Sequence, residues 1–229
     1  MVRVQVTLTS RPDTESRLFH VSTDIVIFAI RRGCLEVLLV RRDSKTQGAP
    51  WALPGGCASV CEPLDECAQR TLRAQTGLRD VYLEQLYTFG RPDRHPEARV
   101  VSVAYYALVA VDRLGAMESG PHSAWHAAGD LPDLHLDHEE IILTARERLE
   151  AKLEYSTIAF QLMPEYFTLS ELQQVYETIC ARPIDKRNFR KRVLAMEHVE
   201  ATDRKRCNGS HRPARLYRYT ARNAIHYLK

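Results

Sequence analysis

The stretch from Trp51 to Leu78 constrains the fold more than any other, because strong backbone signals bound it at each end. It opens with WALPGG, whose two glycines permit a sharp turn or a close backbone approach. Pro63 suits the first turn of a helix, and Gly77 suits the end of one. Between them, apolar residues recur at the period of a helix with one buried face. We therefore expect a loop, a helix and a second loop.

The sequence around this helix alternates between strand and helix patterns. Apolar and β-branched runs predict strands at residues 20–30, 34–42, 81–90 and 99–111, and a helix begins near His138. Strands and helices mixed in this way, with hairpin-like neighbours, indicate an α+β sandwich.

Charge divides the chain unevenly. Residues 1–181 carry 18 basic and 25 acidic side chains, a net charge of −7, and residues 182–229 carry 14 and 4, a net charge of +10; the two sum to the +3 of the whole chain. Such an asymmetry indicates a polyanionic partner for the C-terminal segment.

The length suits two domains, which we expect at residues 1–155 and 156–229.

The C-terminal segment has the pattern of a winged helix-turn-helix domain. Thr168 and Glu171 form a capping box ahead of an apolar helical stripe. Pro183 interrupts that helix, and Asp185 can cap a second one, KRNFRKRVLAME. Two strand-like runs, HVEAT and RLYRYT, flank a basic segment whose Asn-Gly pair is a strong turn signal.

Basic residues gather on this second helix and on the hairpin. In a helix-turn-helix, the second helix meets base edges in the major groove, where Arg suits guanine and Asn suits adenine, and hairpin cations reach phosphates. The expected contacts to double-stranded DNA are Lys186, Arg187, Asn188, Arg190 and Lys191 on the helix, with Arg204, Lys205, Arg206, Arg212 and Arg215 on the hairpin. A solvated basic face and RNA binding are the alternatives, but no RNP-type aromatic strand is present.

The loop–helix–loop segment resembles the Nudix box, the signature of hydrolases that act on nucleoside diphosphates linked to another group. Six of its nine fixed positions match, namely Gly56, Glu62, Arg70, Leu72, Gly77 and Leu78. The other three hold Thr71, Ala74 and Gln75 where the family has glutamates. The resemblance implies a Nudix α/β/α sandwich for the first domain.

The missing glutamates bear directly on catalysis. Nudix hydrolysis uses carboxylates on one helix face to hold Mg²⁺ against the diphosphate. Glu62 is left alone, and we expect Glu66 to pair with Arg70 at i, i+4 spacing rather than to replace a metal ligand. We therefore expect no catalytic residue, no metal site and no required cofactor. The alternative is an active pyrophosphatase on ADP-ribose or NADH with an accessory C-terminal domain.

A scaffold can keep a nucleotide site after losing its chemistry. Guanidinium groups fork onto phosphates, and aromatic rings can stack on a base, although aromatics that alternate along a strand more often belong to the core. The expected ligand contacts are Arg41, Arg42, Gly55, Gly56, Glu62, Arg70, Tyr87, Phe89 and Arg91. In the alternative interpretation the glycines only shape loops, and Arg70 only stabilises the structure of the loop–helix–loop segment. Helix capping explains His135, His138, Glu139 and Glu140 at least as well as a role as catalytic base.

A degenerate Nudix domain joined to a basic winged helix resembles the Nudix-related (NrtR-like) transcriptional regulators over nearly the whole chain. The resemblance implies a repressor of NAD-metabolism genes, a homodimer on a palindromic operator, and ADP-ribose or a related nucleotide as effector. We expect the effector to weaken operator binding through a small rotation at the junction around residues 153–164. A third interpretation, a Nudix scaffold serving only as a protein-interaction module, leaves the +10 segment unexplained.

The cysteines and the hydropathy profile indicate the cellular location to expect. Cys57, Cys61 and Cys67 cluster, but without the spacing of a zinc knuckle, so we expect free thiols. No apolar run of membrane-spanning length is present, and the N-terminal residues lack the apolar region of a signal peptide. A cytoplasmic protein is expected.

Overall fold

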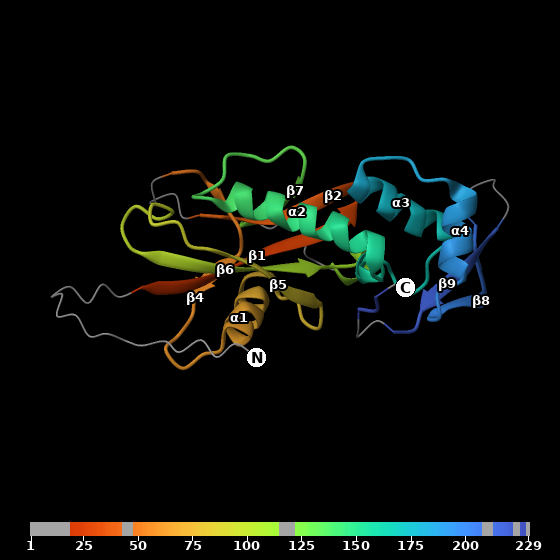
Figure 1. Ribbon diagram of the computed structural model, residues 1–229, viewed down its shortest axis with the longest axis horizontal. Coiled ribbons are helices and arrows are strands. Elements are labelled where there is room, and N and C mark those ends of the chain that lie inside the picture. The colour runs from red at the N-terminus through yellow and green to blue at the C-terminus, as the bar shows by residue number, and fades with distance from the viewer. Residues whose placement is uncertain (1–18, 43–47, 115–121, 208–212, 222–224, 228–229) are drawn as a thin grey trace, which may run out of the picture.

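The computed structural model describes residues 19–42, 48–114, 122–207, 213–221 and 225–227. An N-terminal sheet with a helix on each face is followed by a C-terminal part of helices and a hairpin (Figure 1). The predicted α+β fold class is confirmed, with a sandwich first and a winged helix second.

The N-terminal part is built on a mixed sheet. Its strand order is β3 (Trp51–Ala52), β2 (Cys34–Arg41), β1 (His20–Arg31), β6 (Val100–Leu108) and β5 (Tyr82–Phe89), with β4 (Gly55–Cys57) paired to β1 and β7 (Ser123–Ala127) paired to β2. Strands β1 and β6 run parallel, and the other pairs are antiparallel. The four predicted strands correspond to β1, β2, β5 and β6. Sequence patterns missed β7, which is short and lacks an alternating pattern.

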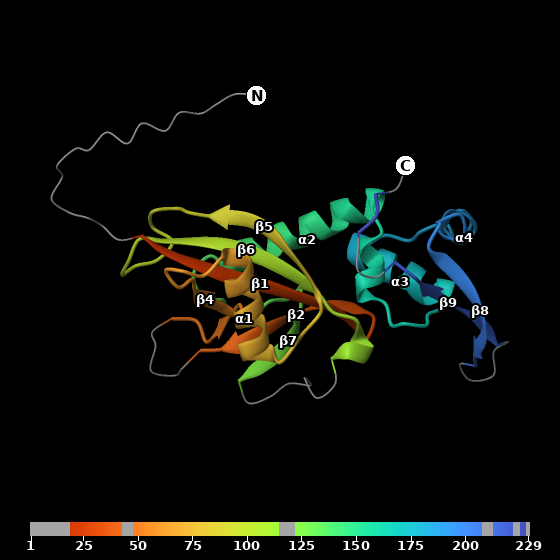
Figure 2. The ribbon, with the colours of Figure 1, turned by 90° about the horizontal axis from the view of Figure 1, so that it is seen from below.

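Helices α1 (Leu64–Thr76) and α2 (His138–Tyr155) cover opposite faces of this sheet (Figures 1 and 2). Strand side chains alternate between the faces, so that Ile27 packs with Leu72 of α1 while Phe28 packs with Ile142 of α2. As expected, α1 follows a proline and ends at Gly77, which has a left-handed φ of 71°.

The C-terminal part contains η2 (Ile158–Leu162), α3 (Leu169–Cys180), α4 (Lys186–Leu194), β8 (Val199–Arg206) and β9 (Ala214–Tyr219). The predicted capping box is formed: Thr168 Oγ1 accepts from the Glu171 N–H at 3.1 Å, and Glu171 Oε2 accepts from the Thr168 N–H at 2.7 Å. The Asp185 carboxylate caps α4 by accepting from the Asn188 N–H at 2.8 Å. Between the helices, Glu177 Oε1 accepts from the Ile184 N–H at 2.9 Å and fixes the turn.

Two boundaries in this part differ from the sequence expectation. Helix α4 ends at Leu194, three residues before the predicted end at Glu197, because the chain turns there: Met196 N–H donates to Val193 O and Val199 N–H donates to Met196 O. Strand β8 runs on to Arg206. The predicted Asn-Gly turn at residues 208–209 lies outside the described residues.

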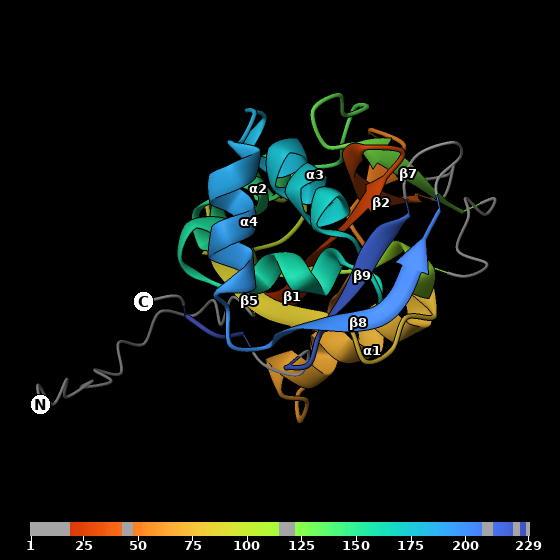
Figure 3. The same ribbon diagram turned by 90° about the vertical axis from the view of Figure 1, so that its right-hand side faces the viewer.

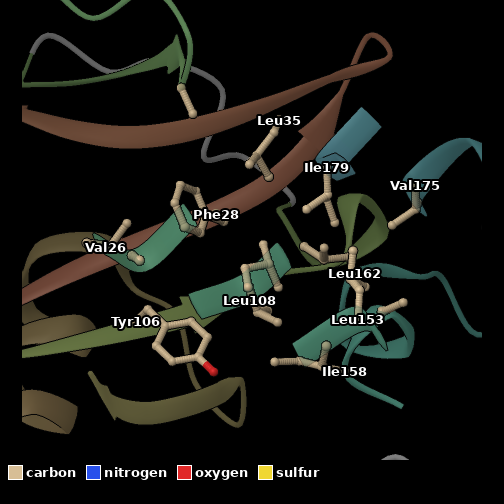
Figure 4. Packing of buried hydrophobic residues seen from close by; sticks show 14 of the residues in the cluster. Val26, Phe28, Leu35, Tyr106, Leu108, Leu153, Ile158, Leu162, Val175 and Ile179 are labelled. Carbon is tan, nitrogen blue, oxygen red and sulfur yellow. The ribbon is translucent and has the colours of Figure 1, made fainter. Parts of the chain in front are cut away.

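One hydrophobic core runs through both parts (Figure 4). Leu153, Ile158 and Leu162 of the junction are at most 3% exposed and lie in the same cluster as Phe28 of the sheet and Ile179 of α3. Most of the stretch 153–164 is therefore packed as core, although Glu154 and Tyr155 are exposed, and the two parts are joined by buried side chains.

Two further observations concern the state of the cysteines and the hydropathy of the helices. All six cysteines are free, and Cys67 is buried in the core. Within the described residues, no helix is long and apolar enough to cross a membrane.

Candidate nucleotide and nucleic-acid interfaces

Arg70 of α1 and Glu62 in the preceding loop form a two-bonded ion pair. Arg70 Nε donates to Glu62 Oε1 at 2.6 Å and Nη2 donates to Oε2 at 2.8 Å. Arg70 also donates to the Cys57 carbonyl at 3.2 Å, and Glu62 accepts from the Ser59 N–H at 3.2 Å. The Arg70 hydrogen bonds are the main reason why the pKa of Glu62 falls to about 2. The predicted pairing of Arg70 with Glu66 is wrong, because the loop folds back over the helix and brings Glu62 closer.

The two glycines before this loop allow β4 to pack tightly against its neighbours. A Cβ on Gly55 would lie 2.3 Å from Asp24 Oδ1, and one on Gly56 would lie 3.0 Å from Thr71 Oγ1. Gln75 Nε2 donates to the Gly55 carbonyl at 2.7 Å. The close backbone approach expected from the sequence is thus made to the chain itself.

This face of α1 does not fit the Mg²⁺ that the Nudix resemblance implies. Mg²⁺ requires several oxygen ligands, usually with carboxylates among them. Here Thr71 is buried with its hydroxyl unpaired among the described residues, Ala74 has no donor atom, and Gln75 points an amide N–H at a carbonyl. Glu62 is held by Arg70. In the described part of the chain, no three His, Cys, Asp or Glu side chains converge as metal ligands.

The predicted ligand residues of β5 and the loop after it differ in exposure. Tyr87 is 60% exposed, whereas Phe89 is 6% exposed and belongs to the core. The two rings meet edge to face with their centroids 5.4 Å apart. Phe89 therefore has no open ring face for a base, and the plain core interpretation holds for it. Arg91 is exposed and pairs with Glu140 in the first turn of α2 at 3.3 Å.

Arg41 and Arg42 lie at the end of β2. Arg41 is exposed, and Arg42 is half-buried beside the loop that carries Gly48. His135 borders the same loop, and burial together with the nearby Arg42 guanidinium lowers its pKa to about 4. His135 is therefore neutral at pH 7, so the positive charge at this position comes from arginine.

A buried ionic cluster, which we define as Asp24, Arg94, Ser102, Asp137 and His138, joins the start of α2 to the sheet. Arg94 donates from Nη2 and Nε to the two oxygens of Asp137 at 2.7 and 2.9 Å, and its Nη2 lies 3.6 Å from Asp24 Oδ2. Ser102 Oγ donates to the same Asp24 oxygen at 2.5 Å. All five side chains are buried, so the pairing offsets the loss of water around their charges.

His138 completes the buried ionic cluster as a neutral group. Its Nδ1 accepts from the Leu53 N–H at 2.9 Å, and its Nε2 faces Asp24 Oδ1 at 3.7 Å. Burial lowers its pKa, which accounts for the neutral form. His138 could be singled out from the sequence, but the role of Asp24 could not; its signal is an acidic residue at the start of the apolar run DIVIFAI.

The outer face of α4 carries the predicted DNA contacts, while Phe189 and Val193 are buried beneath it. The exposed residues are Lys186, Arg187, Asn188, Arg190 and Lys191. Within the described residues, the charged groups of Lys186, Arg187 and Lys191 have no hydrogen-bond or ion-pair partner. Helix α4 and the β8–β9 hairpin lie at the same end of the molecule (Figure 3).

The hairpin adds cations that have no ion-pair partner in the part of the chain that the structure describes. Lys205 and Arg215 are exposed and lie directly opposite each other across β8 and β9. Like charges in this position repel, and a polyanion relieves the repulsion. Arg204 stacks over the ring of Tyr166, with its guanidinium carbon 4.3 Å from the centroid.

Arg206 differs from the other hairpin cations because it is used inside the protein. It donates to Glu171 Oε1 at 2.5 Å and to the Tyr166 carbonyl at 3.0 Å. It thereby fastens the hairpin to the capping box of α3, which explains its position without a DNA contact. Arg212 lies outside the described residues.

Comparison with known proteins matches both parts of the chain. Residues 18–145 match the Nudix domain, and residues 159–219 match the NrtR DNA-binding winged helix domain. The "ADPR responsive transcriptional repressor NtrR" of Acinetobacter baylyi is 36% identical over 86% of this chain and 81% of its own length.

Two solved structures of the Shewanella oneidensis protein NrtR are also similar. NrtR complexed with a 27mer DNA has a TM-score of 0.78 and 32% identity, over 89% of this chain and 94% of the other. The Nudix domain of NrtR complexed with ADP ribose has a TM-score of 0.50 and 31% identity, over 59% of this chain and 90% of the other.

Proposed function

The chain belongs to the NrtR family of Nudix-related transcriptional regulators, and on that premise we propose that it is a DNA-binding repressor released by a nucleotide. The observation that carries the proposal is the exposed, unneutralised basic face of α4 on a capped helix-turn-helix. A protein that neutralises phosphates with Lys and Arg gains affinity by releasing counterions. The family resemblance points to genes of NAD metabolism as targets and to the cytoplasm as location.

We assign base reading to the start of α4 and phosphate contacts to the hairpin. The proposed DNA-binding residues are Lys186, Arg187, Asn188, Arg190, Lys191, Arg204, Lys205 and Arg215, with Arg212 added from the sequence alone. A homodimer on a palindromic operator would place two copies of α4 about 34 Å apart or a multiple of that distance. Residues 156–229 form the proposed DNA-binding domain, and residues 1–155 form the nucleotide-sensing domain.

The proposed effector is ADP-ribose or a close relative. Its expected contacts are Arg41, Arg42, Gly55, Gly56, Glu62, Arg70, Tyr87 and Arg91, with Phe89 supporting Tyr87 from the core. Loss of the helical carboxylates removes the repulsion that an anionic diphosphate would meet without a metal. The same loss supports binding without hydrolysis, so we propose that this protein is not an enzyme and requires no cofactor.

A DNA-shift assay with and without ADP-ribose, run beside a phosphate-release assay with Mg²⁺, tests the proposal. We expect ADP-ribose to weaken operator binding and turnover to stay below the ordinary enzyme range, which begins near 1 s⁻¹. Hydrolysis at or above that rate would favour the pyrophosphatase alternative instead.

The DNA interface has its own test. Arg187→Ala should weaken operator binding by about 1–3 kcal/mol if the side chain reads a base, and each lost phosphate contact should lower the log–log salt slope by about 0.9. Arg79→Ala, an exposed arginine of the N-terminal part, is the matched control and should bind as the unaltered protein does. Equal losses in the two variants would place the DNA interface elsewhere.

A further inference from the structure

Helix α2 belongs to the proposed nucleotide-sensing domain and ends at its boundary with the DNA-binding part (Figure 1). At its N-terminus lie Asp137, the N-cap residue, and His138, the first helical residue, both of the buried ionic cluster. Its last turn carries Leu153, which lies in the core shared with α3 and η2. A displacement of the first turn therefore moves an element that is packed against both parts.

The junction itself does not offer a hinge. Leu153, Ile158, Phe160 and Leu162 are at most 3% exposed, and Phe160 stacks on Tyr219 of β9 with the centroids 4.1 Å apart. A rotation here, as the sequence suggested, would open the core of both parts. Packed interiors move as rigid bodies between discrete arrangements, so the movement has to begin at the other end of α2.

The turn after β5 holds the first turn of α2 at two points. Arg91 pairs with Glu140 at 3.3 Å, and both side chains are more than half exposed. Arg94 grips Asp137 with two hydrogen bonds, and both are buried. The Arg94 N–H donates to the Arg91 carbonyl at 3.3 Å, so the two arginines sit on one hydrogen-bonded turn.

The exposed Arg91–Glu140 pair is weaker than the buried Arg94–Asp137 pair, and this difference allows ligand binding at Arg91 to displace the start of α2. An exposed ion pair contributes little, so a diphosphate that attracts Arg91 can replace Glu140 as its partner. A buried, forked pair is expensive to break, so Arg94 and Asp137 stay together when the turn moves. Arg91 can therefore leave Glu140 for a ligand while Arg94 stays bound to Asp137, so that a movement of the turn also moves the start of α2.

We infer that Arg94 is the positioning residue that couples the nucleotide site to α2, and through α2 to the DNA-binding helix. This inference rests on the proposed function and deepens it, because it assigns the coupling to a residue that touches neither DNA nor nucleotide. The planar guanidinium of Arg94 donates two parallel hydrogen bonds to Asp137 and so fixes the orientation of that carboxylate relative to the sheet. A lysine keeps the charge but cannot form the fork.

The test measures operator affinity with and without saturating ADP-ribose in three proteins: the unaltered chain, Arg94→Lys and Arg31→Lys. Arg31 forms a partly buried pair with Glu36 away from α2, at 2.7 Å, and so provides a matched control. We expect ADP-ribose to lower operator affinity 5- to 150-fold in the unaltered chain, the usual range of such coupling. In Arg94→Lys the ratio should fall below about 3-fold while each ligand alone binds within about 3-fold of normal. Arg31→Lys should keep the full ratio.

A purely structural role for Arg94 would lower stability and leave the ratio unchanged, so an unchanged ratio in a folded Arg94→Lys protein overturns the inference alone. If the unaltered chain shows no effect of ADP-ribose on DNA binding, the proposed function fails and the inference fails with it. If Arg94→Lys does not fold, hydrogen exchange in the unaltered protein decides. ADP-ribose should alter the exchange of the amides at residues 138–142, and unaltered exchange there at saturation overturns the inference.

Discussion

Leu172→Ala should destabilise the N-terminal sandwich even though Leu172 belongs to α3. Leu172 is fully buried in the core that also contains Phe28 of the sheet and Leu153 of α2. Truncating a buried leucine to alanine costs about 2–5 kcal/mol, because the lost transfer free energy adds to that of the cavity left behind. With a urea dependence of about 3 kcal/mol/M, the midpoint should fall by roughly 0.7–1.7 M.

Both tryptophans of the chain, Trp51 and Trp125, lie in the N-terminal part, so their fluorescence reports on that part alone. Urea unfolding followed by tryptophan fluorescence therefore measures whether damage in α3 reaches the sandwich. Leu194→Ala, an exposed leucine of α4, is the control and should change stability by less than about 0.5 kcal/mol. A fluorescence midpoint that Leu172→Ala leaves unchanged would show that the two parts unfold independently and would refute the continuous core.

Two further predictions concern the loop around α1. Gly55→Ala should cost about 1–3 kcal/mol in thermal or urea unfolding, because the new methyl group would lie 2.3 Å from Asp24 Oδ1, whereas Gly90→Ala, with its nearest neighbour at 3.8 Å, should be nearly neutral. The pKa of Glu62 should measure about 2 by NMR titration, because Arg70 stabilises the carboxylate. Since this folded-state pKa is below the ordinary 4.5, the stability from the pair is complete above about pH 4.5 and is lost as the pH falls toward 2; a titration midpoint near 4.5 would contradict the ion pair.

Features set by nearby residues could be predicted from the sequence. The capping box of Thr168 and Glu171 depends on residues three apart, and both hydrogen bonds form. The ends of α1 follow from Pro63 and Gly77, whose backbone preferences act locally. Runs of apolar and β-branched residues also predicted the long strands, because strands such as β1 and β6 are buried on both faces of the sheet and need apolar side chains on both.

Features that depend on distant residues could not be predicted. Arg94 meets both Asp24 and Asp137 only because the fold brings three separate segments together. Arg70 pairs with Glu62 rather than with Glu66 because the loop before α1 folds back toward the helix. The spacing of residues along the helix does not predict this loop conformation. Arg206 looks like any other cation of the hairpin in the sequence, yet its partner Glu171 lies on α3.

The parallel pairing of β1 and β6 has a consequence for how the protein is made. His20 pairs with Val100, about 80 residues later in the chain, and the pairing continues to Phe28 and Leu108. A ribosome adding roughly 5–20 residues per second needs about 4–16 s to supply that partner. During that time β1 can pair only with β2 and β4, and its other edge is open to other chains. High contact order at the centre of the sheet therefore makes the nascent chain, rather than the finished protein, the form that most needs protection from aggregation.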